Sequence, residues 1–202
     1  MSSEFMILSS MFFIGKTSIV YGALAFSFSM LGLILPNTFL VGNPLEVSGV
    51  SFEHVFGHIM WGVVAGIVSI SFRYAILSGL FPIILDFDHW LQFLGIEMIP
   101  RMAHSIIFGL IAVGVMMIIF NRKDLRLGAI AIAAVFSHIS FDIFLVGGTE
   151  FPIFAPFTSK NITFTESYWI LFEFLSITII FVATVIFFRK QKNKNTNKNL
   201  IR

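Results

Sequence analysis

Apolar segments of about 20 residues recur along this 202-residue chain, and they constrain its fold more than any other feature. A helix of that length crosses the hydrocarbon core of a membrane. The chain is 57% hydrophobic and 12% charged, whereas soluble domains carry about 25% charged residues. Disordered chains need low hydrophobicity and high net charge, so they are excluded too. The sequence therefore predicts an all-α, polytopic integral membrane protein of the cell membrane.

We predict a bundle of about six transmembrane helices that forms one domain over residues 1–188. The predicted spans are residues 17–36, 54–72, 74–97, 103–120, 126–146 and 167–188. Residues 189–202 are rich in Lys and Asn and lack an apolar period, so we expect a basic, disordered cytoplasmic tail near anionic lipid headgroups. Membrane lipid is the expected partner. The net charge of +2 is too small to suggest a nucleic acid, and the oligomeric state stays open.

Lysine and arginine set the predicted orientation, because cytoplasmic loops of membrane proteins are enriched in them. If both chain ends are cytoplasmic, the other side holds Arg101 and Lys160 alone of the 13 basic residues. The cytoplasmic side then holds Lys16, Arg73, Arg122, Lys123, Arg126, Arg189, Lys190, Lys192, Lys194, Lys198 and Arg202. We therefore predict an N-in, C-in topology, with the loops 37–53 and 147–166 outside.

All five histidines and three aspartates lie in or at the edge of a predicted span. Ionisable groups are costly inside a membrane, so they usually face the bundle interior and serve a function. Under the predicted topology, four spans deliver these residues at one depth, in the outer half of the bundle. They are His54, His58, Asp86, Asp88, His89, His104, His138 and Asp142.

The spacing of these residues predicts a metal site. His138 and Asp142 are four apart and share one helix face, as do Asp86 and His89, three apart, with Asp88 turned away from them. Imidazole and carboxylate ligands together suit zinc, with manganese or iron as alternatives, whereas an all-oxygen shell would suggest magnesium or calcium. Helix bundles build metal sites from such ligands on facing helices. The chain has no Cys, which excludes thiolate ligands.

Structural interpretations stay open for individual residues of this group. His54 lies nearest the water boundary, so we expect an ordinary interfacial residue there. His58 shares its helix with Gly62 and Gly66, a close-packing GxxxG pair, and could form an interhelical hydrogen bond.

Two further acidic residues have alternative interpretations. Asp88 could form a structural ion pair with Arg101. Glu173, inside the last span, could join the polar cluster or act as a buried proton carrier.

Four short motifs, taken in order, resemble the YdjM-like family of predicted membrane-bound metal-dependent hydrolases. They are Gly57-His58, the LDFDH block at 85–89, Ala103-His104-Ser105 and the SHISFD block at 137–142, followed by a Gly- and Pro-containing loop at 148–156. The match covers about residues 54–157. The chain departs from the family pattern in lacking a Pro directly before Asp86, and it has Ile99 and Ala103 at positions where the family has His and Thr.

The resemblance implies a site and an activity. It implies metal binding by His58, Asp86, His89, His104, His138 and Asp142. For catalysis, we expect Asp88 or Asp142 as the base and a histidine such as His104 as the acid. The activity implied is hydrolysis, and a site at headgroup depth favours a lipid or lipid-linked phosphate or ester, or another small molecule. An ion- or proton-coupled transporter that uses the same groups as a relay, and an inactive membrane scaffold, are the alternatives.

Overall fold

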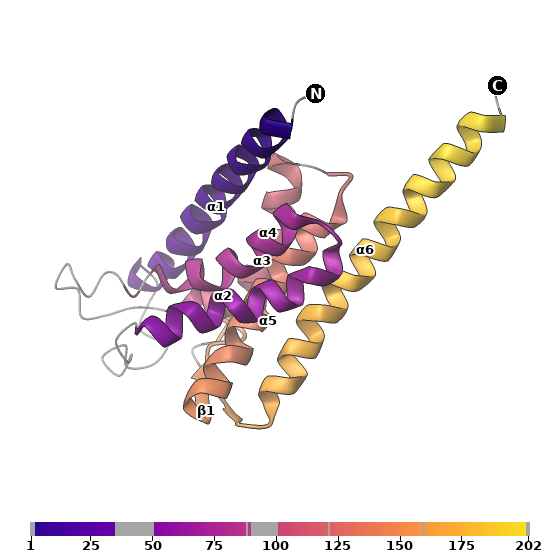
Figure 1. Cartoon of the computed structure of the whole chain (residues 1–202). Helices are drawn as coiled ribbons and strands as arrows, with labels where there is room; N and C mark the ends of the chain where they lie inside the picture. Colours follow the sequence, from indigo (N-terminus) through magenta and orange to yellow (C-terminus); the bar gives the residue numbers. More distant parts are fainter. Residues whose placement is uncertain are drawn as a thin grey trace.

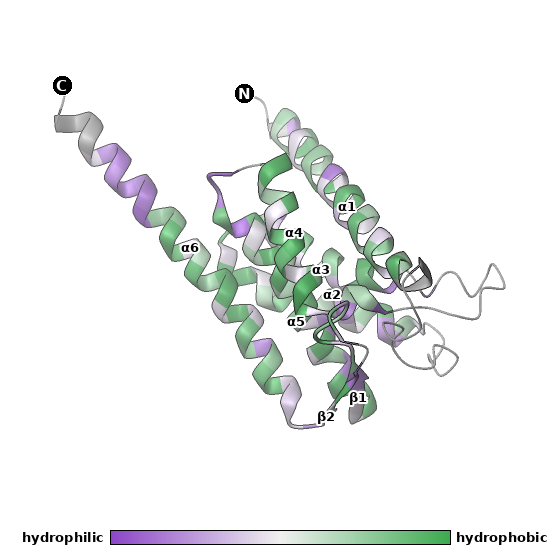
Figure 2. Cartoon of the chain, turned by 180° about the vertical axis from the view of Figure 1, so that it is seen from behind, coloured by the Kyte–Doolittle hydropathy of each residue, from purple (hydrophilic) through white to green (hydrophobic). Residues whose placement is uncertain are grey.

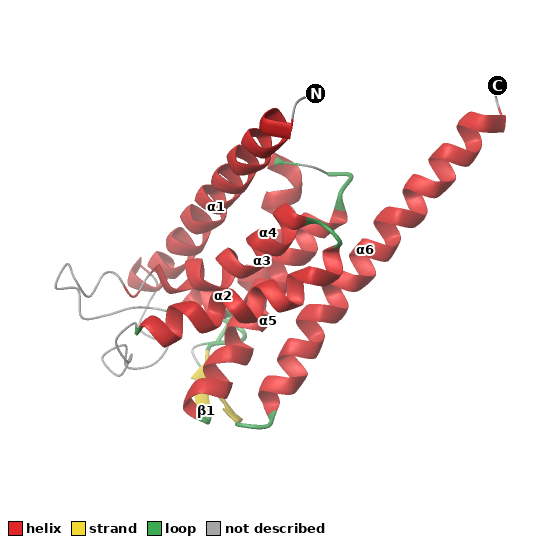
Figure 3. Ribbon diagram, viewed as in Figure 1, coloured by secondary structure: helices red, strands yellow, loops and turns green. Residues whose placement is uncertain are grey.

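The computed structural model describes residues 3–34, 51–87, 89, 101–120, 122–158 and 160–200. These residues form six α-helices, two short 3₁₀ helices and one β-hairpin (Figure 3). The elements are α1 (Ser3–Ile34), α2 (Phe52–Gly66), η3 (Ile67–Ser69), α3 (Phe72–Leu85), η5 (Met102–His104), α4 (Ile106–Ile119), α5 (Leu125–Val146), β1 (Gly148–Phe151), β2 (Ile162–Thr165) and α6 (Tyr168–Leu200). The predicted all-α membrane fold is confirmed, with the hairpin as an addition inside the loop 147–166.

The two chain ends lie at the same end of the molecule, and the hairpin lies at the opposite end (Figure 1). Four helical stretches are long and apolar enough to cross a membrane: Glu4–Leu31, Phe52–Ser69, Leu125–Val146 and Tyr168–Thr196. Most residues of these helices are hydrophobic, and hydrophilic residues concentrate toward the end of α6 and in the connections (Figure 2).

The other two helices, α3 and α4, are shorter than predicted spans 74–97 and 103–120. Each has 14 residues, which at about 1.5 Å per residue gives about 21 Å, against about 30 Å of hydrocarbon. Helix α3 ends at Leu85, inside the predicted span, and the predicted end of that span lies outside the described residues, as do residues 90–97. Helices α3 and α4 therefore end part of the way along the bundle.

Helix α5 is the centre of the bundle. It packs against α2, α3, α4 and α6, and almost all of its residues from Arg126 to Ile143 are buried. Small residues such as Ala131, Ala133 and Ala134 let the neighbouring helices approach closely. A polar side chain on this helix is therefore surrounded by protein on all sides.

Glycines hold α2 against α3. A Cβ atom on Gly62 would overlap the Ser78 backbone, and one on Gly66 would lie 2.6 Å from the Ser78 Cβ. The predicted role of this GxxxG pair in close packing is confirmed. The contact fixes α2 and α3 as one antiparallel unit, so the start of α2 lies beside the end of α3.

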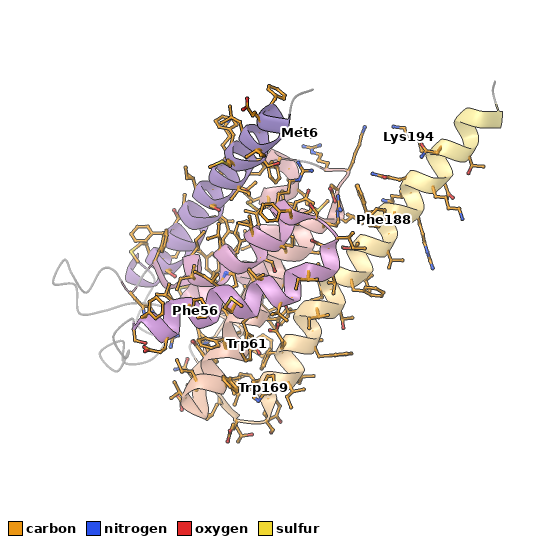
Figure 4. All side chains as sticks on the ribbon, viewed as in Figure 1. Met6, Phe56, Trp61, Trp169, Phe188 and Lys194 are labelled. Carbon is orange, nitrogen blue, oxygen red and sulfur yellow. The ribbon has the colours of Figure 1, made fainter. Side chains whose placement is uncertain are left out.

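Helix α6 continues further than predicted. Its helical structure runs from Tyr168 to Leu200 and includes the basic segment for which we expected disorder. Lys and Gln are good helix formers, and a chain that extends an existing helix avoids the cost of nucleation. The side chains of residues 189–196 are exposed, and Lys194 lies on the end of α6 that stands apart from the other helices (Figure 4).

The β-hairpin closes the end of the molecule opposite the termini. Strands β1 and β2 are antiparallel, with Gly148 opposite Thr165 and Phe151 opposite Ile162. Between them, the Ile153 carbonyl accepts a hydrogen bond of 3.0 Å from the Ile106 N–H at the start of α4. The hairpin is thereby attached to the place where α4 begins.

Candidate metal centre

The predicted ligands meet where α3 ends and α4 begins. The start of α2 supplies His54 and His58, the turn after α3 supplies Asp86 and His89, η5 supplies His104, and the second half of α5 supplies His138 and Asp142. We call these seven residues the His/Asp cluster. All seven are buried. Residues 102–105, which lie outside the α-helices, are buried within the protein, the condition under which backbone outside an α-helix is tolerated in a membrane.

Asp86 lies in the middle of the cluster. Its Oδ2 is 3.0 Å from His54 Nε2 and 3.5 Å from His58 Nε2. Its Oδ1 is 3.4 Å from His89 Nε2 and 3.5 Å from the Nε2 atoms of His104 and His138. All five imidazoles of the chain therefore surround one carboxylate.

Asp142 is the second carboxylate of the cluster. Its Oδ1 is 3.1 Å from His58 Nε2, and its Oδ2 is 3.3 Å from His138 Nε2. The Arg101 Nη2 donates to Oδ2 at 3.2 Å. Arg101 thus pairs with Asp142, and the alternative pair with Asp88 is untested, because Asp88 lies outside the described residues.

His54 is placed wrongly by the sequence analysis. It is 9% exposed, and its Nε2 lies 3.1 Å from His58 Nε2 as well as 3.0 Å from Asp86. The four-residue spacing from His58 was the signal that could have found it, since i and i+4 share a helix face. In the sequence, His54 lies at the start of a predicted span, which suggested contact with water. In the structure, the end of α3 covers it.

Pro82 orients His138. The carbonyl of Pro82 accepts a 2.9 Å hydrogen bond from His138 Nδ1, while the Asp86 N–H, its ordinary helical partner, bonds to the carbonyls of Ile83 and Ile84. Because Nδ1 carries the proton, Nε2 has a free lone pair that faces the two carboxylates. Metal-binding histidines are commonly oriented by such a hydrogen bond from the second ring nitrogen.

Two other contacts place His104. The Ala103 N–H donates to Ser29 Oγ of α1 at 3.3 Å, and Ser105 Oγ caps α4 by accepting from the Phe108 N–H at 3.1 Å. The chain between them is held on both sides of His104. The imidazole is fully buried beside Asp86 as a result.

Several donor atoms of the cluster are buried without a hydrogen bond from the described residues. They are His58 Nδ1, Asp86 Oδ1, both ring nitrogens of His104, His138 Nε2 and Asp142 Oδ1. Buried polar groups are normally satisfied, and such exceptions often mark an ion or a functional site. Of these atoms, His104 Nε2 and His138 Nε2 each lie 3.5 Å from Asp86 Oδ1 without hydrogen-bond geometry, as lone pairs that point to a common centre would. The Nδ1 atoms of His58 and His104 are on the other side of their rings from Nε2.

The separations fit a bound cation. Ligand atoms about 2.1 Å from one ion lie about 3.0 Å apart at right angles and about 3.4 Å apart at a tetrahedral angle. The nitrogen-to-oxygen separations around Asp86 run from 3.0 to 3.5 Å. Three groups of three residues have all donor atoms within 4.8 Å: His54, His58 and Asp142; His58, Asp86 and His138; and Asp86, His89 and His104. The cluster could hold a metal ion.

The charge balance also favours a cation. With neutral imidazoles, the two buried carboxylates outweigh the single positive charge of Arg101. A buried charge without compensation is strongly unfavourable. The cluster therefore has both the ligands and the negative charge that a divalent ion needs.

Aromatic side chains enclose the cluster. The Phe141 ring lies 4.8 Å from the His58 ring, and the space it occupies requires glycine at position 57, where a Cβ would overlap the ring. Phe151 of the hairpin stacks on His104 at 6.4 Å, and Arg101 lies 5.6 Å from the Phe151 ring. The hairpin thus covers the His104 side of the cluster.

A pair of tryptophans, Trp61 and Trp169, packs on another side of the His/Asp cluster. Trp61 Nε1 donates to Ser140 Oγ at 3.1 Å, and Ser140 donates to the Trp169 carbonyl at 2.8 Å. The two indole rings are 5.8 Å apart, and both are visible at the lower part of the bundle (Figure 4). These contacts connect α2, α5 and α6 next to Asp142.

Two further candidate residues are not placed in the His/Asp cluster by the described part of the chain. Asp88, the candidate base, lies outside the described residues. Glu173 is buried on α6 but belongs to none of the three donor groups found among the described residues, so the structure does not place it in the His/Asp cluster.

A family model described as YdjM inner membrane protein matches residues 50–200. That range covers most of the chain and contains the whole His/Asp cluster. Neither the curated proteins nor the solved structures contain a match.

Proposed function

This chain belongs to the YdjM inner membrane protein family, and from that premise we propose that it is a membrane-bound, metal-dependent hydrolase. The observation that carries the proposal is the convergence of five imidazoles and two carboxylates, with buried donor atoms that lack hydrogen bonds within the described chain. A cluster that served packing alone would satisfy these atoms internally.

Zinc is the metal we propose, with manganese or iron as alternatives. The donors are mostly imidazole nitrogens, which suit these ions better than magnesium or calcium. A divalent ion held here would polarise a substrate oxygen and lower the pKa of water toward about 7, which provides a nucleophile at neutral pH.

The protein's own residues have separate proposed roles. Asp142 faces His58, His138 and Arg101, so its two oxygens suit ligation better than proton transfer. Asp88 stays the proposed general base, because it adjoins Asp86 in the chain. His104 is proposed as a ligand that can also assist proton transfer to the leaving group.

Arg101 is proposed to meet the substrate. Its side chain is 19% exposed, whereas that of Asp142, which it contacts, is 5% exposed. A guanidinium at the edge of a buried site offers hydrogen bonds and charge to an anionic oxygen. With the site at headgroup depth, a lipid or lipid-linked phosphate or ester is the substrate class we propose.

We propose a multi-pass arrangement with both termini in the cytoplasm. In an up-and-down bundle, the start of α2, the end of α3, the start of α4 and the end of α5 all lie at one end, and the chain termini lie at the other (Figure 1). Eleven of the 13 basic residues then fall on the cytoplasmic side. The His/Asp cluster accordingly faces the outer leaflet.

The test is turnover by purified full-length protein in mixed micelles with phosphate and carboxylic esters of lipids. We expect hydrolysis that is lost after chelation, restored by zinc or manganese, and abolished in Asp86→Asn. Glu53→Gln is the matched control, because Glu53 is exposed next to His54 and should leave turnover unchanged. Absence of turnover, combined with ion- or proton-coupled uptake in vesicles, would instead favour the transporter.

A further inference from the structure

We propose that the His/Asp cluster holds two cations bridged by Asp86, and that its substrate is a phosphate ester. This inference rests on the proposed function in one respect, namely that the cluster binds metal. It goes further by assigning the number of ions, the bridging residue and the substrate class.

Two of the donor groups share no residue. His54, His58 and Asp142 form one, and Asp86, His89 and His104 form the other. Each has its three donor atoms within 4.8 Å of one another, so each can hold an ion without the other. The third group, His58, Asp86 and His138, takes one member from each and lies between them.

The two oxygens of Asp86 face different imidazoles. Oδ2 lies 3.0 Å from His54 and 3.5 Å from His58. Oδ1 lies 3.4 Å from His89 and 3.5 Å from both His104 and His138. A carboxylate whose oxygens point into two separate sets of ligands has the geometry of a bridge, since each oxygen binds the ion on its own side.

The number of donors points the same way. A zinc ion normally uses four ligands, but seven protein donors converge here. A single ion would leave several of the buried atoms that lack hydrogen bonds without a partner. With two ions, both His58 and His104 can bind a metal, because these residues lie on opposite sides of Asp86.

The resulting charge selects the substrate. Two divalent ions and Arg101 exceed the charge of the two carboxylates, so the occupied cluster carries excess positive charge at a buried position. A phosphoryl group would neutralise that excess, whereas a neutral carboxylic ester would not. Two-metal sites act by holding both the attacking and the leaving oxygen of phosphate esters.

The test uses full-length protein in detergent, stripped of metal and titrated with Mn²⁺. We expect saturation at two ions per chain and the electron paramagnetic resonance signal of a spin-coupled pair. His54→Ala and His89→Ala, which alter different donor groups, should each bind one ion with an uncoupled signal, and Glu53→Gln should match the wild type. Inorganic phosphate should change the wild-type signal.

Different failures identify different errors. Saturation at one uncoupled ion, with metal-dependent hydrolysis retained, would overturn the bridged pair and leave the proposed function intact. Two uncoupled ions would contradict the bridge by Asp86. Indifference of the signal to phosphate would overturn the substrate class, and the absence of any bound ion would overturn the proposed function as well.

Discussion

Two buried polar clusters lie toward opposite ends of α5, and they differ in how their polar atoms are satisfied. The His/Asp cluster has donor atoms without hydrogen bonds from the described residues. The second, the Asp124–Arg126 cluster, comprises Tyr74, Asp124 and Arg126. Arg126 donates to Asp124 at 2.9 and 2.8 Å, and the Tyr74 hydroxyl donates to Asp124 at 2.9 Å.

The polar groups of the Asp124–Arg126 cluster find their partners within the described chain. Arg126 also donates to the Ser69 carbonyl at 3.2 Å and lies 3.6 Å from the Phe187 ring centre. Although burial raises the pKa of Asp124, hydrogen bonds from Arg126 and Tyr74 outweigh it and hold that pKa below its usual value. Buried charges in a membrane protein are therefore structural when they satisfy one another, and the His/Asp cluster is distinguished by failing to do so.

The largest expected effect is an all-or-none difference in access to the two sides of the membrane. Lys160 follows the His/Asp end of α5, and Lys123 adjoins Asp124. We expect an impermeant thiol reagent to label Lys160→Cys but not Lys123→Cys in intact cells. Membrane permeabilisation is the control and should expose both. Labelling of Lys123→Cys alone would reverse the topology and put the His/Asp cluster in the inner leaflet.

Removing one partner of the Asp124–Arg126 cluster should cause the largest loss of stability. Asp124→Ala leaves the Arg126 guanidinium buried without its carboxylate, which costs about 3–5 kcal/mol. Thermal unfolding in detergent measures the loss. Metal content per folded chain should not change, and a fall in metal content equal to that of a ligand variant would show that the two clusters are not independent.

His54→Ala tests the residue that the sequence analysis placed outside the cluster. We expect metal affinity to fall by at least about 10–100-fold, the range seen when even outer-shell partners of metal ligands are lost. Competition with a chelating dye measures the affinity, and Glu53→Gln provides the comparison on the preceding residue. Equal metal affinities for these two variants would show that His54 is an interfacial residue and not part of the metal site.

Gly57→Ala should have the smallest effect, because the overlap it creates is with the end of a side chain. The new methyl group would push the Phe141 ring away and separate α2 from α5. We expect a loss near the lower end of the range for overpacking, about 1–3 kcal/mol. The double variant with Phe141→Leu should recover part of that stability. If it recovers none, the contact between Gly57 and Phe141 is not the cause.

Much of the fold could be predicted from local sequence. The limits of α4 and α5 follow apolar runs closely, and Asp124 and Ser105 mark their starts as N-caps. The early end of α3 could not be predicted in the same way. Residues beyond Leu85 are apolar enough to extend a helix, yet α3 ends there, and Asp86 and His89, which follow it, lie in the cluster.

The site was predictable as a group but not in its details. Spacing alone relates His138 to Asp142, because both lie on one helix. The contacts of Arg101 with Asp142 and of His54 with Asp86 depend on how different segments of the chain pack, and no local pattern encodes that. The hydrogen bond from His138 to the Pro82 carbonyl joins residues 56 apart in the chain, so it too needed the structure.

The central claim is that the His/Asp cluster binds metal while the Asp124–Arg126 cluster does not need it. Elemental analysis of purified wild type, Asp86→Asn and Asp124→Ala tests this claim most directly, with each ratio expressed per folded chain. We expect the same zinc or manganese content of at least one ion in wild type and Asp124→Ala, and a large loss in Asp86→Asn. Metal-free wild type, or equal metal in all three proteins, would contradict the claim.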